Sequence, residues 1–367
     1  MNERLRKLQE IGQSVWIDSL SRDDIENGNL ERMIEDGVVG VTSNPTIFQK
    51  ALSESSLYDD QLQELSQRLD DPKETFWELA AKDIRDACDT LMPVFERTNR
   101  LDGYVSLEVS PDIAYDTPKT VAEAQRLHQI VDRPNLFVKI PATQPGLAAI
   151  EEMIAMGKSI NVTLIFSLAR YRAVAGAYFR GLQRLVADGG DPSGVASVAS
   201  FFVSRVDTEG DRRLDEVGRP DLKGRLAIEN ARLAYQEFKK IFSGDDWGFL
   251  ESKGATKQRP LWASTSTKNP DYPDVIYVEN LIAPDTVNTM PHSTLEATMD
   301  HAEIRPTLDE GVGEARAFLG ELREAGVDYE EVVETLEKEG VQKFADSFEE
   351  LLEEIRNKSR QVVSQRG

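Results

Sequence analysis

The sequence predicts an α/β protein, a single (β/α)8 TIM barrel with extra N-terminal and C-terminal helices. Two observations lead to this expectation. Short runs of strand-forming residues recur eight times along the 367 residues, and longer stretches with helical periodicity separate them. Strands that alternate with helices pair in parallel through right-handed crossovers, and eight of them close a barrel. The alternative is a doubly wound open sheet, which usually has fewer strands and, in nucleotide binders, a Gly-x-Gly-x-x-Gly turn that is missing after the first run.

Eight segments have the composition of buried strands, because each is short and rich in β-branched, aromatic or other apolar residues. In chain order they are "SVWIDSL" from Ser14, "GVVGVTSN" from Gly37, "YVSLEVS" from Tyr104, "LFVKIPA" from Leu136, "SINVTLIF" from Ser159, "ASVASFFVSRVD" from Ala196, "RPLWASTS" from Arg259 and "DVIYVENLIA" from Asp274. Helical patterns such as "KTVAEAQRLHQIV" and "KGRLAIENARLAYQEFKKIF" lie between them. This alternation is what a barrel of eight βα units requires.

Further helices are expected outside the repeating units. The crossover 53–101 is long enough for two or more helices, and the crossover 208–258 carries a polar stretch before its helix. From about residue 290 to 367 the chain has the pattern of acidic helices packed on the barrel. Their inward face in the last helix comprises Phe348, Leu351, Leu352 and Ile355. No linker marks a second domain, so residues 1–367 are predicted to form one domain.

Composition and charge argue against several classes of function. The formal net charge is −22, whereas a nucleic-acid partner requires a basic face. An anionic substrate would therefore need a local cluster of cations. Cys88 is the single cysteine, which excludes an internal disulfide and a cysteine-based zinc site, and its helical setting predicts a small buried side chain. The three histidines, His128, His292 and His301, do not have the spacing of metal ligands, so we expect no metal site.

The chain is expected to be cytoplasmic. Its first residues, "MNERLRKLQEIGQ", are charged and lack the apolar core of a signal peptide. No apolar run approaches the length that spans a bilayer, so a membrane is not an expected partner. A homo-oligomer is compatible with the sequence.

Lys139 is the most informative residue of the predicted strands. It lies inside "LFVKIPA", and a lysine is almost never fully buried without a partner. Alternation along a barrel strand points every second side chain into the barrel. Leu136, Val138 and Ile140 then face the helices, while Lys139 faces the interior in the later part of its strand. Catalytic groups of such barrels sit at this C-terminal end.

The same alternation points polar side chains of four other strands into the barrel. This inward set contains Asp18, Thr42, Asn44, Ser106, Glu108, Ser110, Asn161 and Thr163. One or two of them would be explained as hydrogen-bonding groups at strand ends. Barrel interiors are normally filled by Val, Ile and Leu, so an Asp, a Glu, a Lys and two Asn on one interior indicate a reaction centre.

These side chains together suit Schiff-base chemistry. Burial favours the neutral form of an amine, and a neutral amine attacks carbonyl groups. The protonated imine withdraws electrons, so a C–C bond one atom further out breaks when a base removes the proton of the adjoining hydroxyl. Asp18 or Glu108 would be that base, and the other would move protons through water. Asn44 and Asn161 suit hydrogen bonds to sugar hydroxyls. The alternative role of Lys139 is a structural ion pair with Glu108.

At these residues the sequence resembles the transaldolase family, with a similarity that runs from "WIDSLSRDDI" to "NLIAPDTVNTMP". The motifs that carry it are "GVTSNPTIF", "VSLEVSPDIAYD", "LFVKIPATQPGLAAI", "INVTLIFS" and "WASTSTKNP", which are specific together although each alone is weak. The resemblance implies a (β/α)8-barrel class I enzyme of the pentose phosphate pathway that needs no cofactor. It also implies sugar-phosphate substrates: a dihydroxyacetone unit would pass reversibly from sedoheptulose 7-phosphate to glyceraldehyde 3-phosphate, giving erythrose 4-phosphate and fructose 6-phosphate.

The resemblance implies a role for each inward residue. Lys139 would form the Schiff base, and Asp18 would be the acid/base for cleavage of the C–C bond. Glu108 would move protons through a water held by Thr163. The side chains that would contact the bound unit are Asn44, Asn161 and Ser200.

The family pattern points to Arg205, Ser266 and Lys268 as the phosphate site. Many members of the family carry Arg where this chain has Lys268, and Lys binds phosphate as a point charge and not as a bidentate fork. Arg205 has the opposite parity to Ser200 along the strand, so we expect it beyond the strand end or after a bulge.

Two alternative functions stay open at this point. Fructose 6-phosphate aldolase has the same fold and Schiff base but releases free dihydroxyacetone. The resemblance associates that activity with a shorter-chain subfamily that has Gln at the position of Glu108 and Tyr at the position of Phe202. The residues present here therefore favour transfer. The other alternative is a sugar-phosphate-binding barrel without catalysis, which would need no reactive lysine.

Overall fold

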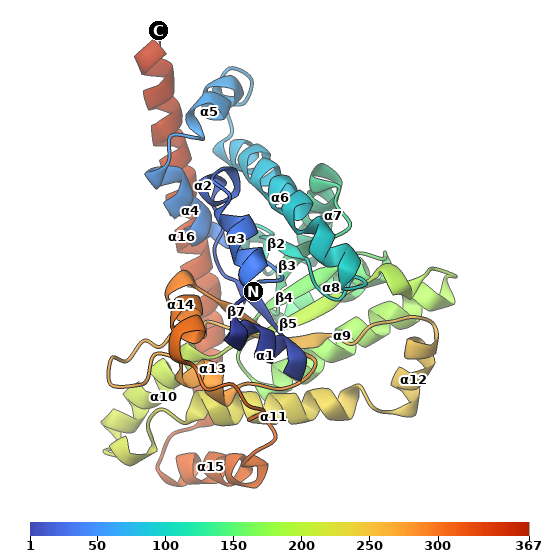
Figure 1. Cartoon of the computed structure of the whole chain (residues 1–367), viewed down its shortest axis with the longest axis vertical. Coiled ribbons are helices and arrows are strands. Elements are labelled where there is room, and N and C mark those ends of the chain that lie inside the picture. The colour runs from blue at the N-terminus through green and yellow to red at the C-terminus, as the bar shows by residue number, and fades with distance from the viewer. Residues whose placement is uncertain (367) are drawn as a thin grey trace.

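The computed structural model describes residues 1–366 of the chain. Parallel strands form one curled sheet in the order β1-β7-β6-β5-β4-β3-β2, and helices surround it (Figure 1). The strands are β1 (Gln13–Ile17), β2 (Val105–Glu108), β3 (Leu136–Pro141), β4 (Ile160–Ile165), β5 (Ser197–Phe202), β6 (Arg259–Ala263) and β7 (Thr286–Met290). The predicted α/β class with a parallel sheet is therefore confirmed. Residue 367, the last of the expected domain, lies outside the described range, and the expectation of a single domain stays a prediction.

The predicted strand from Gly37 does not form, and residues 1–366 contain seven strands where eight were expected. Within residues 37–44 only Val41 makes β-bridges, one to β1 and one to β2, which are the two edge strands of the sheet. Gly40 passes so close to Trp16 that a Cβ at this position would lie 2.5 Å from the indole ring. The segment forms no regular ladder, but through Val41 it connects both edges of the sheet.

The predicted strand from Asp274 is also wrong, because residues Ile276–Asn280 form the helix α13. Its buried side chains, Tyr277 and Val278, are followed by buried Leu281, which is the spacing of one helix face. The last strand is instead β7, "TVNTM", which the sequence reasoning missed. Its five residues are all buried although three are polar, so apolar content could not identify it.

Helices account for most of the remaining chain. The α-helices are α1 (Glu3–Ile11), α2 (Arg22–Glu26), α3 (Asn29–Asp36), α4 (Pro45–Glu54), α5 (Asp59–Ser66), α6 (Pro72–Arg97), α7 (Thr117–Val131), α8 (Gln144–Ala155), α9 (Leu168–Ala187), α10 (Ser204–Glu216), α11 (Leu226–Ile241), α12 (Asp245–Ser252), α13 (Ile276–Asn280), α14 (His292–His301), α15 (Val312–Glu324) and α16 (Tyr329–Arg366). Short 3-10 helices are η1 (Pro111–Ile113), η2 (Pro192–Gly194) and η3 (Pro220–Leu222). Many begin at a residue whose side chain accepts a backbone N–H of the first turn, as Asn44, Thr143 and Ser167 do.

Aromatic rings fill the interior below the polar residues of the strands. Phe137 stacks on Tyr104 and on Trp16, with ring centroids 4.0 and 6.1 Å apart. Lys139 lies two residues further along the same strand, so its side chain leaves the same face of the sheet nearer to the C-terminal end. The amine therefore stands above an apolar floor.

The C-terminal helix α16 crosses the molecule from the sheet to the far ends of α4 and α5, beyond which its last turns project (Figure 1). Phe348, Leu351 and Ile355 are buried and Leu352 is partly buried, which confirms the predicted inward face. Near its end, Lys358 pairs with Asp59 of α5 at 3.2 Å. The helix is thus anchored along most of its length.

Two further expectations concern the burial of Cys88 and the length of apolar helices. Cys88 is fully buried in α6, which confirms its prediction as a core residue, and burial raises the pKa of its thiol. Among residues 1–366, no helix combines the length and the apolar composition needed to cross a membrane.

Candidate active site

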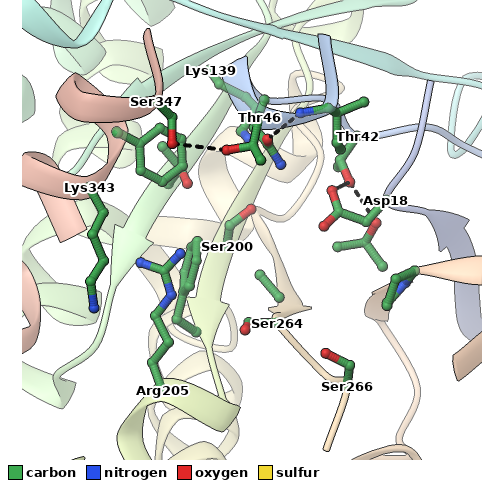
Figure 2. Close-up of a pocket in the computed structure, with 18 of the residues that line it drawn as sticks. Asp18, Thr42, Thr46, Lys139, Ser200, Arg205, Ser264, Ser266, Lys343 and Ser347 are labelled. Carbon is green, nitrogen blue, oxygen red and sulfur yellow. Dashed lines mark hydrogen bonds between the residues drawn. The ribbon is translucent and has the colours of Figure 1, made fainter. Parts of the chain in front are cut away.

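A cleft of about 280 Å³ opens at the C-terminal ends of the strands (Figure 2). This volume is near the lower end of the range for small-molecule sites. Most of the residues predicted for the site line it: Asp18, Asn44, Lys139, Thr163, Ser200, Phe202, Arg205, Ser266 and Lys268. The other two lie directly behind this lining, Glu108 against Lys139 and Asn161 against Ser200. The fold therefore brings the whole predicted set together.

Lys139 carries the amine of the site. Its Nζ donates to the carbonyl oxygen of Ser43 at 2.9 Å and lies 3.1 Å from Oε2 of Glu108, in a pair whose side chains are 7% and 6% exposed. Strand register sets Glu108, Lys139 and Asn161 side by side on β2, β3 and β4. Burial raises the pKa of Glu108, and the adjacent lysine opposes that shift. A carboxyl group with a raised pKa beside an amine is suited to exchange protons with it.

A chain of two hydroxyl groups orients the carboxylate of Asp18. The Thr42 hydroxyl donates to Oδ1 of Asp18 at 2.7 Å (Figure 2), and the Thr289 hydroxyl lies 2.7 Å from that of Thr42. Because the single proton of Thr42 is used toward Asp18, Thr289 is the donor in the second bond. Thr289 belongs to β7, the strand that the sequence did not reveal.

A second chain of hydrogen bonds holds the amide of Asn161. Its Nδ2 donates to the hydroxyl of Ser106 at 3.1 Å, and its Oδ1 accepts from the hydroxyl of Ser200 at 2.7 Å. Asn44 is fixed differently, since its Oδ1 caps α4 by accepting the N–H of Ile47 at 3.1 Å. Both amides are therefore held in one orientation.

Two residues beside the cleft have left-handed backbone although neither is glycine: Leu164 with φ 60° and Ser264 with φ 57°. Leu164 lies where the register between β4 and β5 shifts, and such a bulge interrupts the alternation of side chains just after Thr163. The side chain of Leu164 packs toward Gly340 of α16. The hydroxyl of Thr163 has no hydrogen-bond partner within residues 1–366.

Two cations line the other end of the cleft. Arg205 lies in the first turn of α10, beyond the end of β5 as expected, with its guanidinium 5.2 Å from the centroid of Phe202. Its Nη1 is buried and has no hydrogen-bond partner among the described residues. Lys268 donates to the hydroxyl of Ser266 at 2.7 Å. Burial lowers the pKa of both cations, and the charge of Arg205 lowers that of Lys268 further. An anion bound between the two side chains would stabilise both positive charges.

Two tyrosine–aspartate bonds join the elements that carry the cations. Tyr277 donates to Asp207 at 2.8 Å, and Tyr272 donates to Asp211 at 2.6 Å. The aspartates belong to α10, whereas Tyr272 lies in the segment between β6 and α13 and Tyr277 lies in α13. The helix with the arginine is thus tied to the segment that carries Lys268. Burial raises the pKa of Asp207 to about 7.

The sequence reasoning missed one wall of the cleft, which α16 supplies through Lys343, Phe344 and Ser347. Thr46 donates to Ser347 at 3.0 Å across this wall (Figure 2). The sequence did indicate that Phe344 faces inward, since it precedes Phe348 of the predicted inward face by one helical turn. What that face would pack against was not readable from periodicity.

Comparison with known proteins agrees with this geometry. The profile of the family described as "Transaldolase/Fructose-6-phosphate aldolase" matches residues 15–355. The chain belongs to this family. A transaldolase of Frankia alni is 52% identical over 357 residues, which cover 96% of each chain. A transaldolase of Acidothermus cellulolyticus is 50% identical over 371 residues and the full length of both chains, and transaldolase 2 of Streptomyces avermitilis is 49% identical over 372 residues, also full length.

The expected transaldolase family and enzyme class are therefore confirmed, and the protein is an enzyme of the transferase type. The individual roles of the residues in the cleft stay predictions.

Proposed function

We propose that the protein transfers a dihydroxyacetone unit between sugar phosphates, from sedoheptulose 7-phosphate to glyceraldehyde 3-phosphate and in reverse. The observation that carries this proposal is the position of Lys139 Nζ, a buried amine between a carboxyl group and a backbone carbonyl at the edge of an open cleft. The cations at the other end of the same cleft supply the attraction for a phosphate that the net charge of −22 does not.

The reaction begins with the neutral amine of Lys139. It adds to the C2 carbonyl of the ketose phosphate, and loss of water leaves a protonated imine. Glu108 is 3.1 Å from the amine and exchanges the protons of addition and dehydration with it. The hydroxyl of Thr163, which has no hydrogen-bond partner within residues 1–366, would hold a water molecule that relays these protons to the substrate oxygen.

Cleavage needs a base at the C4 hydroxyl. Asp18 lines the cleft, and its carboxylate is oriented by Thr42. When it removes the hydroxyl proton, the C3–C4 bond breaks, the aldose phosphate leaves, and the electron pair is held by the imine as an enamine. The enamine carbon then adds to an acceptor aldehyde, and Asp18 returns the proton to the new hydroxyl. Water hydrolyses the resulting imine, which releases the product ketose phosphate and restores the amine of Lys139.

Polar side chains would hold the three-carbon unit between the two half-reactions. Ser200 faces the cleft and is oriented by Asn161 behind it. Asn44 uses its oxygen for the helix cap, so a substrate hydroxyl would meet its Nδ2. The phosphate would bind at Arg205 and Lys268, with Ser266 between them in the donor set.

We also infer that the curled sheet and the segment through Val41 together correspond to the eight-unit barrel. Val41 bridges both edge strands, so this segment would occupy the eighth position. A cytoplasmic location stays a prediction.

Borohydride trapping tests the proposed function. Reduction in the presence of fructose 6-phosphate should attach the sugar unit covalently to Lys139, which peptide mass spectrometry would locate. Lys139→Met should lose the label and all measurable turnover while keeping its melting temperature. Lys119→Met, at an exposed lysine of α7, is the matched control and should be labelled like the wild type. A folded wild-type protein that takes no label would contradict the proposal and favour a binding barrel without catalysis.

Release of free dihydroxyacetone is the alternative activity. Glu108 and Phe202 are present where the resemblance associates release with Gln and Tyr, so transfer is the expected main reaction. Assays with and without an acceptor aldose distinguish the two, because a transferase is slow when no acceptor is present.

A further inference from the structure

The last helix is seated tightly over the cleft at two points. At Gly340 of α16 a Cβ would lie 3.2 Å from Leu164 and 3.4 Å from Phe166, so the helix backbone rests against the end of β4. Two turns later Phe348 packs on Phe76 and Trp77 of α6, with ring centroids 5.6 and 6.4 Å apart. These two contacts hold the helical turn between them in place over the cleft.

Phe344 lies on that turn and closes the space above the amine. Its ring centroid is 5.9 Å from Nζ of Lys139, and its side chain is half-buried and lines the cleft. Other directions around Nζ are taken by Oε2 of Glu108 and the carbonyl oxygen of Ser43. The phenyl ring is therefore an apolar wall beside a nitrogen whose remaining neighbours are polar.

We propose that Phe344 excludes water from the covalent intermediate and so determines whether the three-carbon unit is transferred or hydrolysed. This inference rests on the proposed function, because it concerns the lifetime of the imine on Lys139. Phe344 makes no bond to the substrate in this role. It acts by limiting the access of water to the three-carbon intermediate before an acceptor adds.

The competing reaction can be written in full. The enamine takes a proton at its carbon terminus and becomes the protonated imine of dihydroxyacetone. Water adds to the C=N carbon and the C–N bond breaks, which releases dihydroxyacetone and restores the amine of Lys139. Both reactions end with hydrolysis of an imine, which takes up the water that imine formation gave off. They differ in what happens to the enamine first: in release its carbon is protonated and the three-carbon imine is hydrolysed, whereas in transfer it adds to the acceptor aldehyde before hydrolysis. The ratio of the two rates therefore reports how well water is excluded from the three-carbon intermediate before an acceptor adds.

The experiment measures this ratio in Phe344→Ala. Release of dihydroxyacetone is followed with fructose 6-phosphate alone, and transfer is followed with fructose 6-phosphate and erythrose 4-phosphate. We expect the release-to-transfer ratio to rise about tenfold, which corresponds to about 1.4 kcal/mol of barrier difference. Phe344→Leu keeps more of the apolar bulk and should give a smaller rise. An unchanged ratio in the folded alanine variant would overturn the inference.

Leu351→Ala is the matched control. Leu351 is buried on the same face of α16 but does not line the cleft, so its truncation removes apolar contacts from the helix without opening the space above Lys139. Its ratio should match the wild type even if its melting temperature falls. A similar rise in both variants would assign the effect to helix seating and not to Phe344.

Trapping separates failure of this inference from failure of the proposed function. If borohydride labels Lys139 in the wild type and in Phe344→Ala but the ratio is unchanged, only the role of Phe344 is wrong. If neither protein is labelled, the Schiff-base mechanism itself is wrong. Should the alanine variant not fold, the ratio measured for Phe344→Leu decides, and equality with the wild type overturns the inference.

Discussion

The two ends of the cleft are built in opposite ways. At the lysine end, Asp18, Glu108 and Lys139 already have partners in the protein, and strands or their immediate ends carry them. At the cation end, Arg205 has a buried nitrogen without a hydrogen-bond partner among residues 1–366, and a helix turn and a loop supply the groups. The charged groups of the lysine end are thus paired within the protein, whereas a charged nitrogen of the cation end is not.

This difference separates catalysis from binding in energetic terms. Groups that perform chemistry gain from orientation fixed in advance, because no reorganisation is then needed in the transition state. A desolvated cation without a partner destabilises the free protein, and a bound anion offsets that cost. Substitutions at the two ends should therefore alter different kinetic constants.

Asp18→Asn should have the largest effect at the lysine end. The amide keeps the size of the carboxylate but cannot remove a proton, so we expect kcat to fall by about 10²- to 10⁴-fold with little change in KM. Steady-state kinetics of the transfer reaction would show it. Trapping of Lys139 with borohydride should persist, since imine formation does not require Asp18, and a large rise in KM alone would contradict the assignment.

Arg205→Gln should have a smaller effect, confined to binding. Loss of charge-assisted bonds to phosphate, worth about 1.5–3 kcal/mol, predicts a KM for sugar phosphates raised by about ten- to a hundredfold. Competitive inhibition by inorganic phosphate should weaken in parallel. If kcat fell and KM stayed at the wild-type value, the proposed division of the cleft into two ends would be wrong.

Asp207→Asn tests the hydrogen bond that ties α10 to Tyr277, and it should have the smallest effect of the three substitutions. The expected change is in how the free energy of unfolding depends on pH. Unfolded Asp ionises near pH 3.9, whereas Asp207 keeps its proton to about pH 7 in the folded protein. Between these values the unfolded chain binds fewer protons, so the wild-type free energy of unfolding falls as pH rises, by about 1.4 kcal/mol per unit from this group. The asparagine variant should lack this component of the slope.

Urea unfolding at several pH values between about 5 and 6 measures the difference in slope. Glu324→Gln, at an exposed acid of α15, is the control and should keep the wild-type slope. Equal slopes in the wild type and Asp207→Asn would show that Asp207 is already ionised in this range.

Sequence reasoning succeeded where a strand is buried and strictly alternating. "YVSLEVS" and "LFVKIPA" show this clearly: the residues of one parity are apolar, and Glu108 and Lys139 stand out in the other parity. It failed for β7, where Thr286, Asn288 and Thr289 are buried polar residues and leave no apolar pattern. The shift of register between Val162 and Ile165 also leaves no trace in composition.

The part of the site formed by α16 shows a different limit. Periodicity identified the apolar face of this helix, including Phe348, but amphipathicity does not say which surface a helix covers. That choice depends on contacts between segments far apart in the chain, such as Gly340 with Leu164. Lys343, Phe344 and Ser347 could be recognised only from the packed structure.

The pairing of β1 with β7 has a consequence for the order of events during synthesis. Residues 13–17 are made almost at the start, but their partners 286–290 emerge only after most of the chain. Contacts of such large sequence separation make folding slow, because a long loop must close before they form. A nascent chain therefore carries β1 with one edge unpaired through most of translation. Asp18, immediately after β1, acquires its backbone bond to Met290 only at the end. The position of Asp18 in the active site can therefore be fixed only after most of the chain has been synthesised.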